Sequence, residues 1–526
     1  MSIISNLRNE ILSRVDWTLI FAVIVFVYIF KTYRLYFTTR KSRPPGPIPL
    51  PIIGHLHHVI GNVADKKSQL NDKYGELCEI TMFGYRCVII SKPEYLKELF
   101  SPNVYSPFLR RLPVSEGFKA VGMDCEGLLL NHDVDKWRHN RKFFTKSLSP
   151  PSFIKLSVKY TAEACAELTK YWGTLKHDRM VRLDEWYRAF TSDMMGLVAS
   201  GAKEDSMRIY YEKLHGLKGQ GKQTKSLSRG EQYRLLRTEY PDALAFFIFV
   251  PKILWSLPII RNQVQRYRNV LDNLTSFEVD FINKRKESLQ KTDQKDNEKE
   301  SVRDDFLTML LTQNGETDSS ADIIKQNIRE MFSAGTGTTT SALCAVAYLL
   351  AKNPECEERM VNELFSVLGK DRNIELADLS KLTYTEMVIN ETMRLYPVVP
   401  LTYRYSPKTE LKIAEYVFPA NTIFTINLAH MHRNPRYFPN PNAFDPERFA
   451  GNWKERYPQY AFSPFGQGVK ACPGRNFAMA EMKTILAQVY RKYTFKLVKP
   501  DEPLHFKFSL VNDISKLEAY LEERKV

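Results

Sequence analysis

Cysteine is scarce in this chain, and its spacing does not resemble a disulfide framework or a zinc site. The 526 residues contain 7 cysteines, which are widely separated and include no CxxC pair. Disulfide-rich secreted domains and zinc fingers both depend on paired or clustered cysteines. The cysteine content therefore argues against both classes and favours a reducing compartment.

Glycine and proline are also sparse, and no internal repeat is visible. Together they make up 51 residues, about a tenth of the chain, which excludes collagen-like and low-complexity proteins. Hydrophobic residues reach 44% and charged residues 26%, a balance that excludes wholesale disorder. The length by itself suggests roughly two to four domains.

The sequence lacks any basic run that is interleaved with aromatic residues. Its formal net charge of +15 is compatible with nucleic acid, a membrane surface or an acidic protein partner. Because lysine and arginine are spread along the chain and mixed with acids, the sequence does not favour nucleic acid.

A hydrophobic run near the N-terminus has no charged residue. Residues 17–30 read WTLIFAVIVFVYIF, which is short for ~30 Å of hydrocarbon, but apolar residues on both sides extend the run. A cleaved signal peptide is the alternative, yet bulky and basic residues follow where a small-residue cleavage site would lie. We predict an uncleaved transmembrane helix within an anchor over residues 1–43. The basic residues after the run place the C-terminal bulk in the cytosol.

A proline-rich segment, residues 44–51 (PPGPIPLP), opens the rest of the chain, 44–526. Proline fixes φ and favours extended backbone, which predicts a stiff spacer. The segment is either a hinge that orients a globular body on the membrane, which we favour, or a ligand for a proline-binding domain.

The body alternates short strand-like pieces with helical stretches at first and is mostly helical from about residue 150 to residue 352. Residues 284–305 are highly charged and predict a solvated loop or helix end. Residues 216–230 predict another exposed loop. The apolar segment 246–258 (FFIFVPKILWSLP) is either core or a lip that dips into the membrane beside a substrate entrance.

One long helix is predicted over residues 322–350, which contain no proline and would span ~40 Å. Its middle, residues 334–341, reads AGTGTTTS, and glycines and successive hydroxyl residues form helices poorly. This is either a harmless soft spot or, as we favour, a place where something packs close to the backbone.

Cys472 stands in a glycine-rich loop, residues 465–474, that reads FGQGVKACPG. Glycines permit a tight turn that directs the sulfur away from its own backbone, and Pro473 takes the position of a first helical residue. A thiol at a helix N-terminus is favoured as thiolate. With no cysteine or histidine beside it, a zinc site or an iron–sulfur cluster would lack ligands. Haem needs one protein thiolate, because the macrocycle supplies four donors.

On these residues the sequence resembles the cytochrome P-450 family, over roughly residues 44–520. The motif F-x-x-G-x-x-x-C-x-G is matched at Phe465, Gly468, Cys472 and Gly474. The resemblance implies a mainly α fold with smaller β-sheets (α+β), preceded here by the transmembrane helix. It also implies heme b as cofactor, with Cys472 as the iron ligand and with Phe465 and Gly474 beside the haem.

Further residues match positions that bind the haem in this family. W-x-x-x-R is matched at Trp137 and Arg141, and the resemblance implies that both donate to a haem propionate. It implies the same role for Arg404. Lys470 stands two residues before the cysteine, where the family usually has arginine, and it keeps the charge but loses the bidentate fork.

The family's E-x-x-R motif is matched at Glu391 and Arg394, and its P-E-R-F segment at residues 446–449. The resemblance implies a buried cluster in which Glu391 lies between Arg394 and Arg448 and braces the loop leading to Cys472. We expect a structural role for all three residues.

The family's distal-helix motif, A-G-x-(acid)-T-T, is matched by residues 334–339 with one departure. In the family the acid and the following threonine manage water and proton delivery. Thr338 matches the threonine, but Gly337 occupies the acid position. Waters held by neighbouring threonines, or a hydroxyl of the substrate, could replace the missing carboxylate.

Taken together, the resemblance implies a haem-dependent monooxygenase that inserts one oxygen atom of O2 into a lipophilic steroid, terpenoid, fatty acid or xenobiotic. Because no flavin or nicotinamide fingerprint is present, electrons would come from NADPH through a membrane-bound flavoprotein reductase. We expect a single-pass protein of the endoplasmic reticulum membrane with a cytosolic catalytic domain. The alternatives are a haem-thiolate peroxide isomerase or dehydratase, against which Thr338 argues, and a non-catalytic haem-binding sensor.

Overall fold

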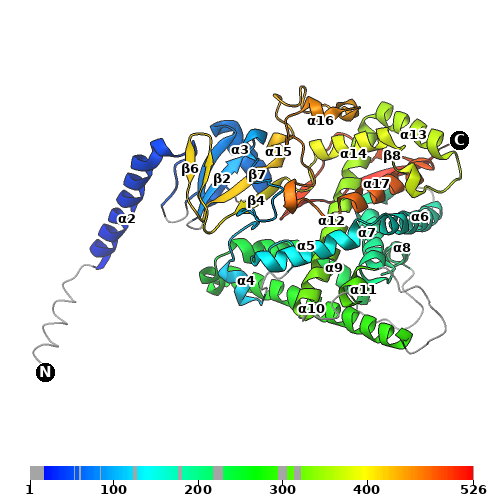
Figure 1. The fold of residues 1–526 in the computed structure, drawn as a ribbon, viewed down its shortest axis with the longest axis horizontal. Helices are drawn as coiled ribbons and strands as arrows, with labels where there is room; N and C mark the ends of the chain where they lie inside the picture. The colour runs from blue at the N-terminus through cyan, green and yellow to red at the C-terminus, as the bar shows by residue number, and fades with distance from the viewer. Residues whose placement is uncertain are drawn as a thin grey trace, which may run out of the picture.

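The computed structural model describes residues 17–51, 54–58, 61–82, 85–122, 127–175, 180–216, 229–293, 305–312 and 321–524. Within these ranges the protein is mainly helical with small sheets (Figure 1), which confirms the predicted fold class. The helices are α2 (Trp17–Thr39), α3 (Val63–Tyr74), α4 (Glu116–Ala120), α5 (Val134–Leu148), α6 (Pro151–Gly173), α7 (Leu183–Ser200), α8 (Ser206–Leu214), α9 (Arg229–Phe249), α10 (Pro258–Asp293), α11 (Phe306–Thr312), α12 (Ala321–Lys352), α13 (Pro354–Leu368), α14 (Thr383–Leu395), α15 (Leu428–Met431), α16 (Trp453–Arg456) and α17 (Arg475–Tyr490).

The largest sheet has the strand order β1-β2-β7-β4 and lies at the end of the body from which α2 projects (Figure 1). Strands β2 and β7 run parallel, with Cys87 opposite Ile423, whereas β1 and β4 pair antiparallel at the two edges. A second, antiparallel sheet has the order β3-β11-β8. The strands are β1 (Leu77–Met82), β2 (Tyr85–Ile90), β3 (Met180–Arg182), β4 (Leu401–Tyr405), β5 (Leu411–Ile413), β6 (Tyr416–Phe418), β7 (Ile423–Asn427), β8 (Tyr493–Leu497), β9 (Phe506–Phe508), β10 (Asn512–Ile514) and β11 (Glu518–Glu523).

Helix α12 passes through the largest core and confirms the single helix predicted for residues 322–350. Its C-terminal half is buried, with Leu343, Val346 and Leu350 almost fully enclosed. A helix that is apolar on nearly all sides must be surrounded by other elements. α12 is therefore the central helix of the largest hydrophobic core.

The predicted transmembrane segment forms α2, which extends away from the body (Figure 1). The stretch Thr18–Thr39 is long and apolar enough to cross a membrane, and none of it is buried within the protein. Its large hydrophobic side chains, such as Phe21 and Phe26, are mostly exposed. An exposed apolar helix of this length fits a lipid environment far better than water.

The apolar segment 246–258 has features of both of the predicted alternatives. Phe247 and Trp255 are buried in a core cluster with Phe118 of α4. Ile253, in contrast, is 84% exposed, and Leu257 is also exposed. The segment therefore packs one face against the body and presents the other to the surroundings.

The structure describes only parts of the two segments predicted as exposed loops, 284–305 and 216–230. Residues 284–293 continue α10 to its end, and 294–304 lie outside the described residues, as does most of the segment 216–230. The end of α10 agrees with the predicted helix end, whereas Asp305 is not solvated as predicted. It is buried, and its carboxylate accepts a hydrogen bond of 2.6 Å from Arg285 Nη2. The internal ion pair removes the cost of burying either charge alone.

Candidate active site

A cavity of about 430 Å³ lies between α12 and the loop that precedes α17. The structure places eight of the predicted site residues along its wall, whereas Glu391, Arg394 and Arg448 lie outside that lining. The eight are Trp137, Arg141, Thr338, Arg404, Phe465, Lys470, Cys472 and Gly474. These residues are separated by up to 337 positions in sequence, from 137 to 474, so only the tertiary fold brings them together.

The loop carrying Cys472 is a tight turn that its glycines allow. Gly466 and Gly468 have φ of 69° and 67°, a left-handed conformation that favours glycine. A Cβ on Gly468 would lie 2.2 Å from the carbonyl oxygen of Phe100, so no larger residue fits there. The Cys472 amide donates a hydrogen bond of 2.8 Å to the Phe465 carbonyl, which closes the turn.

The helix after the loop begins two residues later than predicted. α17 starts at Arg475 with Gly474 as its N-cap, so Pro473 precedes the cap and does not occupy the first helical position. Pro473 therefore contributes to the turn itself. The Gly474 amide still points at the sulfur and lowers the pKa of the Cys472 thiol.

The Cys472 side chain lies deep among protein atoms but is accessible from the cavity. Burial raises the pKa of its thiol above the ordinary value, and the Gly474 amide, Arg141 and Arg111 oppose that rise. The sequence predicted that a position at a helix N-terminus would lower the pKa of this thiol. The pKa is raised instead, because the effect of burial outweighs that of the nearby amides. A bound cation is the group that would hold this sulfur as a thiolate.

Four cationic side chains line one end of the cavity: Arg111, Arg141, Arg404 and Lys470. Burial and the charges of the other members lower the pKa of Lys470 well below its usual value. Burial also lowers the pKa of Arg404, and the Arg111 charge adds to the effect. Four like charges buried together are costly, so this end of the cavity favours an anionic group.

Each of these cations is held in place by protein carbonyls. Arg141 Nη1 donates to the Ala471 carbonyl at 2.7 Å, and Arg404 Nε donates to the Leu99 carbonyl at 2.8 Å. Arg111 donates to the Lys470 carbonyl at 3.4 Å and to the Thr402 hydroxyl at 2.7 Å. These contacts fix the guanidinium groups without neutralising them, because carbonyl and hydroxyl oxygens carry no net charge.

Trp137 and Lys470 adjoin in this cluster. Lys470 Nζ lies 4.3 Å from the centre of the Trp137 ring and 3.5 Å from the Leu128 carbonyl. Trp137 Nε1 is buried and has no hydrogen-bond partner among the described residues, and the same holds for Arg111 Nε. Two donors without acceptors beside a cavity indicate that a ligand supplies the acceptors.

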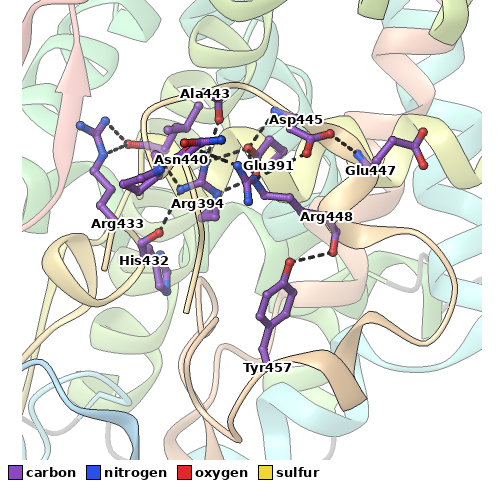
Figure 2. Close-up of polar contacts among 12 residues, drawn as sticks. Glu391, Arg394, His432, Arg433, Asn440, Ala443, Asp445, Glu447, Arg448 and Tyr457 are labelled. Carbon is purple, nitrogen blue, oxygen red and sulfur yellow. Dashed lines mark hydrogen bonds and ion pairs between the residues drawn. The ribbon is translucent and has the colours of Figure 1, made fainter. Parts of the chain in front are cut away.

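Glu391 and Arg394 form a fully buried ion pair (Figure 2). Arg394 Nε and Nη2 donate to the two carboxylate oxygens at 2.6 and 2.7 Å, and the Asp445 amide donates to Glu391 at 2.9 Å. Arg448 Nε lies 3.4 Å from the same carboxylate but makes no hydrogen bond to it. Arg448 therefore contributes its charge, whereas Arg394 makes the bidentate contact.

Arg394 uses its remaining donors to hold the segment that leads toward the loop. It donates to the carbonyl oxygens of His432, Pro441 and Ala443 at 3.1, 2.7 and 3.0 Å (Figure 2). All five N–H groups of the guanidinium therefore have an acceptor. A lysine could not span these acceptors, because an ammonium has three donors on a single atom.

The glycines of α12 have different surroundings. A Cβ on Gly335 would lie 2.2 Å from Met195 Sδ of α7, so here a neighbouring helix packs close to the backbone. A Cβ on Gly337 would meet nothing within 4 Å, because this position faces the cavity. Thr338 Oγ1 donates to the Ala334 carbonyl at 2.5 Å.

A family model described as Cytochrome P-450 matches residues 44–519. The chain belongs to the cytochrome P-450 family. It is 27% identical over 498 residues to tabersonine 6,7-epoxidase isoform 2 of Catharanthus roseus, covering 92% of both chains. It is 27% identical over 511 residues to cytochrome P-450 3A6 of Oryctolagus cuniculus, covering 93% of both chains. Aromatase of Homo sapiens is 28% identical over 451 residues, covering 85% of this chain and 81% of that protein.

As a cytochrome P-450, the chain is an oxidoreductase of the monooxygenase type, and the family's cofactor is haem. The cavity suits that group on three observations made above. The Cys472 thiol is accessible from the cavity. The cluster of buried cations favours an anionic ligand. Trp137 Nε1 and Arg111 Nε lack hydrogen-bond acceptors among the described residues. A thiolate-bound iron porphyrin with two carboxylates would satisfy all three.

Among the residues of this P-450 cavity that sequence reasoning missed are Arg111 and Glu330. Arg111 lies in a loop outside any motif, so no spacing pointed to it. Glu330 lies on α12 and accepts hydrogen bonds from the Leu128 and Leu129 amides at 2.5 and 2.9 Å. Burial raises the pKa of Glu330, while the two amides oppose the rise. The sequence could have pointed to Glu330, because it precedes Gly337 by seven residues, or two helical turns, and so lies on the same face of α12.

Proposed function

We propose that this P-450 inserts one atom of O2 into a lipophilic small molecule, while the other atom leaves as water. NADPH would supply the two electrons through a membrane-bound flavoprotein reductase. Residues 1–43 would anchor the protein as a single pass in the endoplasmic reticulum membrane. Residues 44–526 would form the cytosolic catalytic domain, joined to the anchor through the hinge at 44–51.

One observation carries this proposal: Cys472 and Thr338 line the same cavity from opposite elements. Cys472 would hold the haem iron through its thiolate, and the haem, when bound, would supply the oxidative chemistry. Thr338 would hold a water on the α12 side and relay a proton from its hydroxyl. Phe465 and Gly474 would flank the cofactor on the loop side.

The cationic cluster would bind the two propionates. Trp137, Arg141, Arg404 and Lys470 are the predicted donors, and Arg111 joins them because its Nε is buried without an acceptor. Glu391, Arg394 and Arg448 would brace the Cys472 loop and would not touch the cofactor. The apolar stretch between the two ends, formed by residues such as Val398 and Val399, would receive the substrate.

The axial ligand is tested by Cys472→Ser. We expect the variant to lose the red-shifted Soret band of the reduced carbon monoxide adduct, because a serine oxygen is a weaker donor than a thiolate. Difference spectra of parent and variant give the answer. Cys356→Ser is the matched control, since that thiol lies on α13 outside the cavity lining. A variant that keeps the band would overturn the ligand assignment.

The reaction class is tested by leaving out NADPH, the reductase or O2 in turn. A monooxygenase needs NADPH, reductase and O2 together, whereas a peroxide isomerase or dehydratase turns over a hydroperoxide with none of them. A haem-binding sensor turns over nothing under either condition. We expect product only when all three are present.

A further inference from the structure

The distal end of the cavity, away from Cys472, carries a cluster of three arginines. Arg188 comes from α7, and Arg234 and Arg237 lie three residues apart on α9, so both face the same way. Burial lowers the pKa of Arg234, and the nearby charges of Arg188 and Arg237 add to the effect, while Glu185 opposes it. The arginine cluster is separate from the group of cations described above near Cys472.

Each arginine has an acidic neighbour, but two of the three acids are not among the residues that line the cavity. Arg237 pairs with Glu204 at 2.5 Å, and Arg234 lies 3.6 Å from Glu185. Neither glutamate lines the cavity, whereas both arginines do. Asp513, which pairs with Arg188 at 2.7 Å, does line it. Asp242 and Lys507 also line the cavity and pair with each other, so they add no net charge. The cavity therefore meets more positive than negative charge at this end.

Most N–H groups of the arginine cluster are not used in hydrogen bonds to the protein. Within the described part of the chain only two of its N–H groups donate hydrogen bonds, one from Arg188 and one from Arg237. Arg237 is 5% exposed, and its Nε and Nη1 have no hydrogen-bond acceptor among the described residues, although the guanidinium stacks on the rings of Tyr233 and Phe332. Ser192, one turn after Arg188, lines the same cavity, and its buried hydroxyl also lacks a hydrogen-bond partner in the described part of the chain. Buried donors without acceptors are costly unless a ligand satisfies them.

The rest of the wall between the arginine cluster and Cys472 is mostly apolar. Met195, Leu244, Ile248, Met331, Val398 and Val399 line it. A ligand that fits both parts has an apolar body and an acidic group at one end. Guanidinium forks match a planar carboxylate or a sulfate in geometry as well as in charge.

We infer that the substrate of this enzyme is an amphipathic acid, whose carboxylate or sulfate binds Arg188, Arg234 and Arg237 while its apolar body extends toward Cys472. The inference rests on the proposed function and narrows its substrate class. It places oxidation on the apolar part of the molecule, remote from the acidic group.

The test compares acids with neutral partners of the same shape. The full-length, haem-loaded protein is first checked by its carbon monoxide difference spectrum, which tests the proposed function separately. It is then titrated with linear C12–C18 carboxylic acids and their methyl esters, and with a steroid sulfate and its parent alcohol. The Soret shift and calorimetry both report binding, and calorimetry does so without relying on the iron.

In at least one pair we expect the acid to bind about tenfold tighter than its neutral partner. Arg234→Gln should reduce that preference to within about threefold, because this arginine makes no hydrogen bond that the substitution would break. Arg234→Lys should retain part of the preference. Arg266→Gln, which removes an exposed charge from α10, is the matched control and should leave it unchanged.

Arg237 needs a paired change, since Arg237→Gln alone would leave Glu204 buried without its partner. The double variant Arg237→Gln/Glu204→Gln removes both charges together and should also lose the acid preference. Equal binding of acid and neutral partner in every pair would overturn the inference. An acid preference that survives both Arg234→Gln and the double variant would overturn it as well. Either result with a normal carbon monoxide spectrum leaves the proposed function intact.

Discussion

At the scale of single residues, Gly337 stands where the distal-helix motif predicts an acid. The open space around it means that a carboxylate can be added without displacing protein atoms. We expect Gly337→Asp to raise coupling, the fraction of NADPH consumption that yields product. A carboxylate beside Thr338 would hold a water on the cavity side of α12, and Thr338→Ala should act in the opposite direction and release more peroxide. Product and peroxide are measured against NADPH consumed.

Gly337→Ala is the control for this experiment, because it adds a side chain without a charge. Any alanine or aspartate at this position also gains some helix propensity over glycine. Unchanged coupling in both Gly337→Asp and Thr338→Ala, with intact haem binding, would show that protons arrive by a route outside α12. Delivery assisted by the substrate would then be the leading explanation.

Glu481 is a second informative residue, because its carboxyl lies on α17 with no hydrogen-bond partner among the described residues. Burial raises its pKa to about 8. Between the ordinary value near 4.5 and about 8, the folded protein holds a proton that the unfolded chain releases. The carboxyl therefore makes folding less favourable as pH rises through that window, by at most about 1.4 kcal/mol per pH unit.

Glu481→Gln should remove this slope, because a carboxamide does not titrate. The thermal stability of the variant relative to the parent should rise steadily between pH 5.5 and 7.5, with any constant offset reflecting the new amide group. Denaturation midpoints at three pH values (about 5.5, 6.5 and 7.5) measure the effect. Parallel curves for the two proteins would mean that Glu481 is ionised in the fold.

At the scale of elements, α2 and the segment 246–258 both present apolar surface to the surroundings. Ile253 is 84% exposed and Ile259, at the start of α10, is 93% exposed. Their neighbour Trp255 packs with α4, which lies at the same end of the body as α2 in Figure 1. Both apolar surfaces can therefore reach one membrane.

Deleting residues 1–43 should leave a haem-binding body that is released more readily from membranes but still binds lipid vesicles weakly. Adding Ile253→Glu and Ile259→Glu should abolish the residual binding, because a charge at each tip opposes insertion. Tyr520→Glu on β11 is the matched control, since that exposed residue lies on the second sheet. Sedimentation with vesicles measures the effect, and loss of haem on deletion would show that the anchor is part of the fold.

The elements differ in how far the sequence could predict them. The single helix over 322–350 was predictable, because no proline interrupts a stretch that is long enough for one continuous helix. The split character of 246–258 was not, because both alternatives need the same apolar composition. Asp305 illustrates the same limit, since a charged run gives no sign that one of its acids meets Arg285 inside the fold.

At the scale of the whole molecule, the loop motif predicted Cys472 because one short segment carries all of its chemistry. The cavity wall is different. Arg188 and Asp513 form an ion pair across 325 residues, and Arg111 reaches Thr402 across 291. Contacts of this kind follow from the packing of α7, β4 and β10, which no local spacing encodes. Sequence reasoning therefore predicted a lipophilic substrate but missed the charges that would hold its acidic end.

The net charge of +15 leads to a prediction about the electron donor. Exposed lysines of α5, among them Lys142 and Lys146, lie on the helix whose Arg141 contacts the Cys472 loop. A partner that docks on α5 would therefore approach the cysteine side of the cavity. We expect the rate of haem reduction by an acidic flavoprotein reductase to fall as salt increases, because the screening length shrinks from about 10 Å at 0.1 M to about 3 Å at 1 M.

The double variant Lys142→Glu/Lys146→Glu should reduce that rate at low salt by about tenfold or more, and the difference from the parent should disappear at high salt. Lys286→Glu, an exposed lysine of α10, is the control and should have little effect in either condition. Stopped-flow absorbance of the carbon monoxide adduct follows the reduction. Chemical reduction by dithionite should be equally fast in all variants, because it needs no docking surface. A reductase rate that is independent of salt and of the α5 charges would place the docking site elsewhere on the molecule.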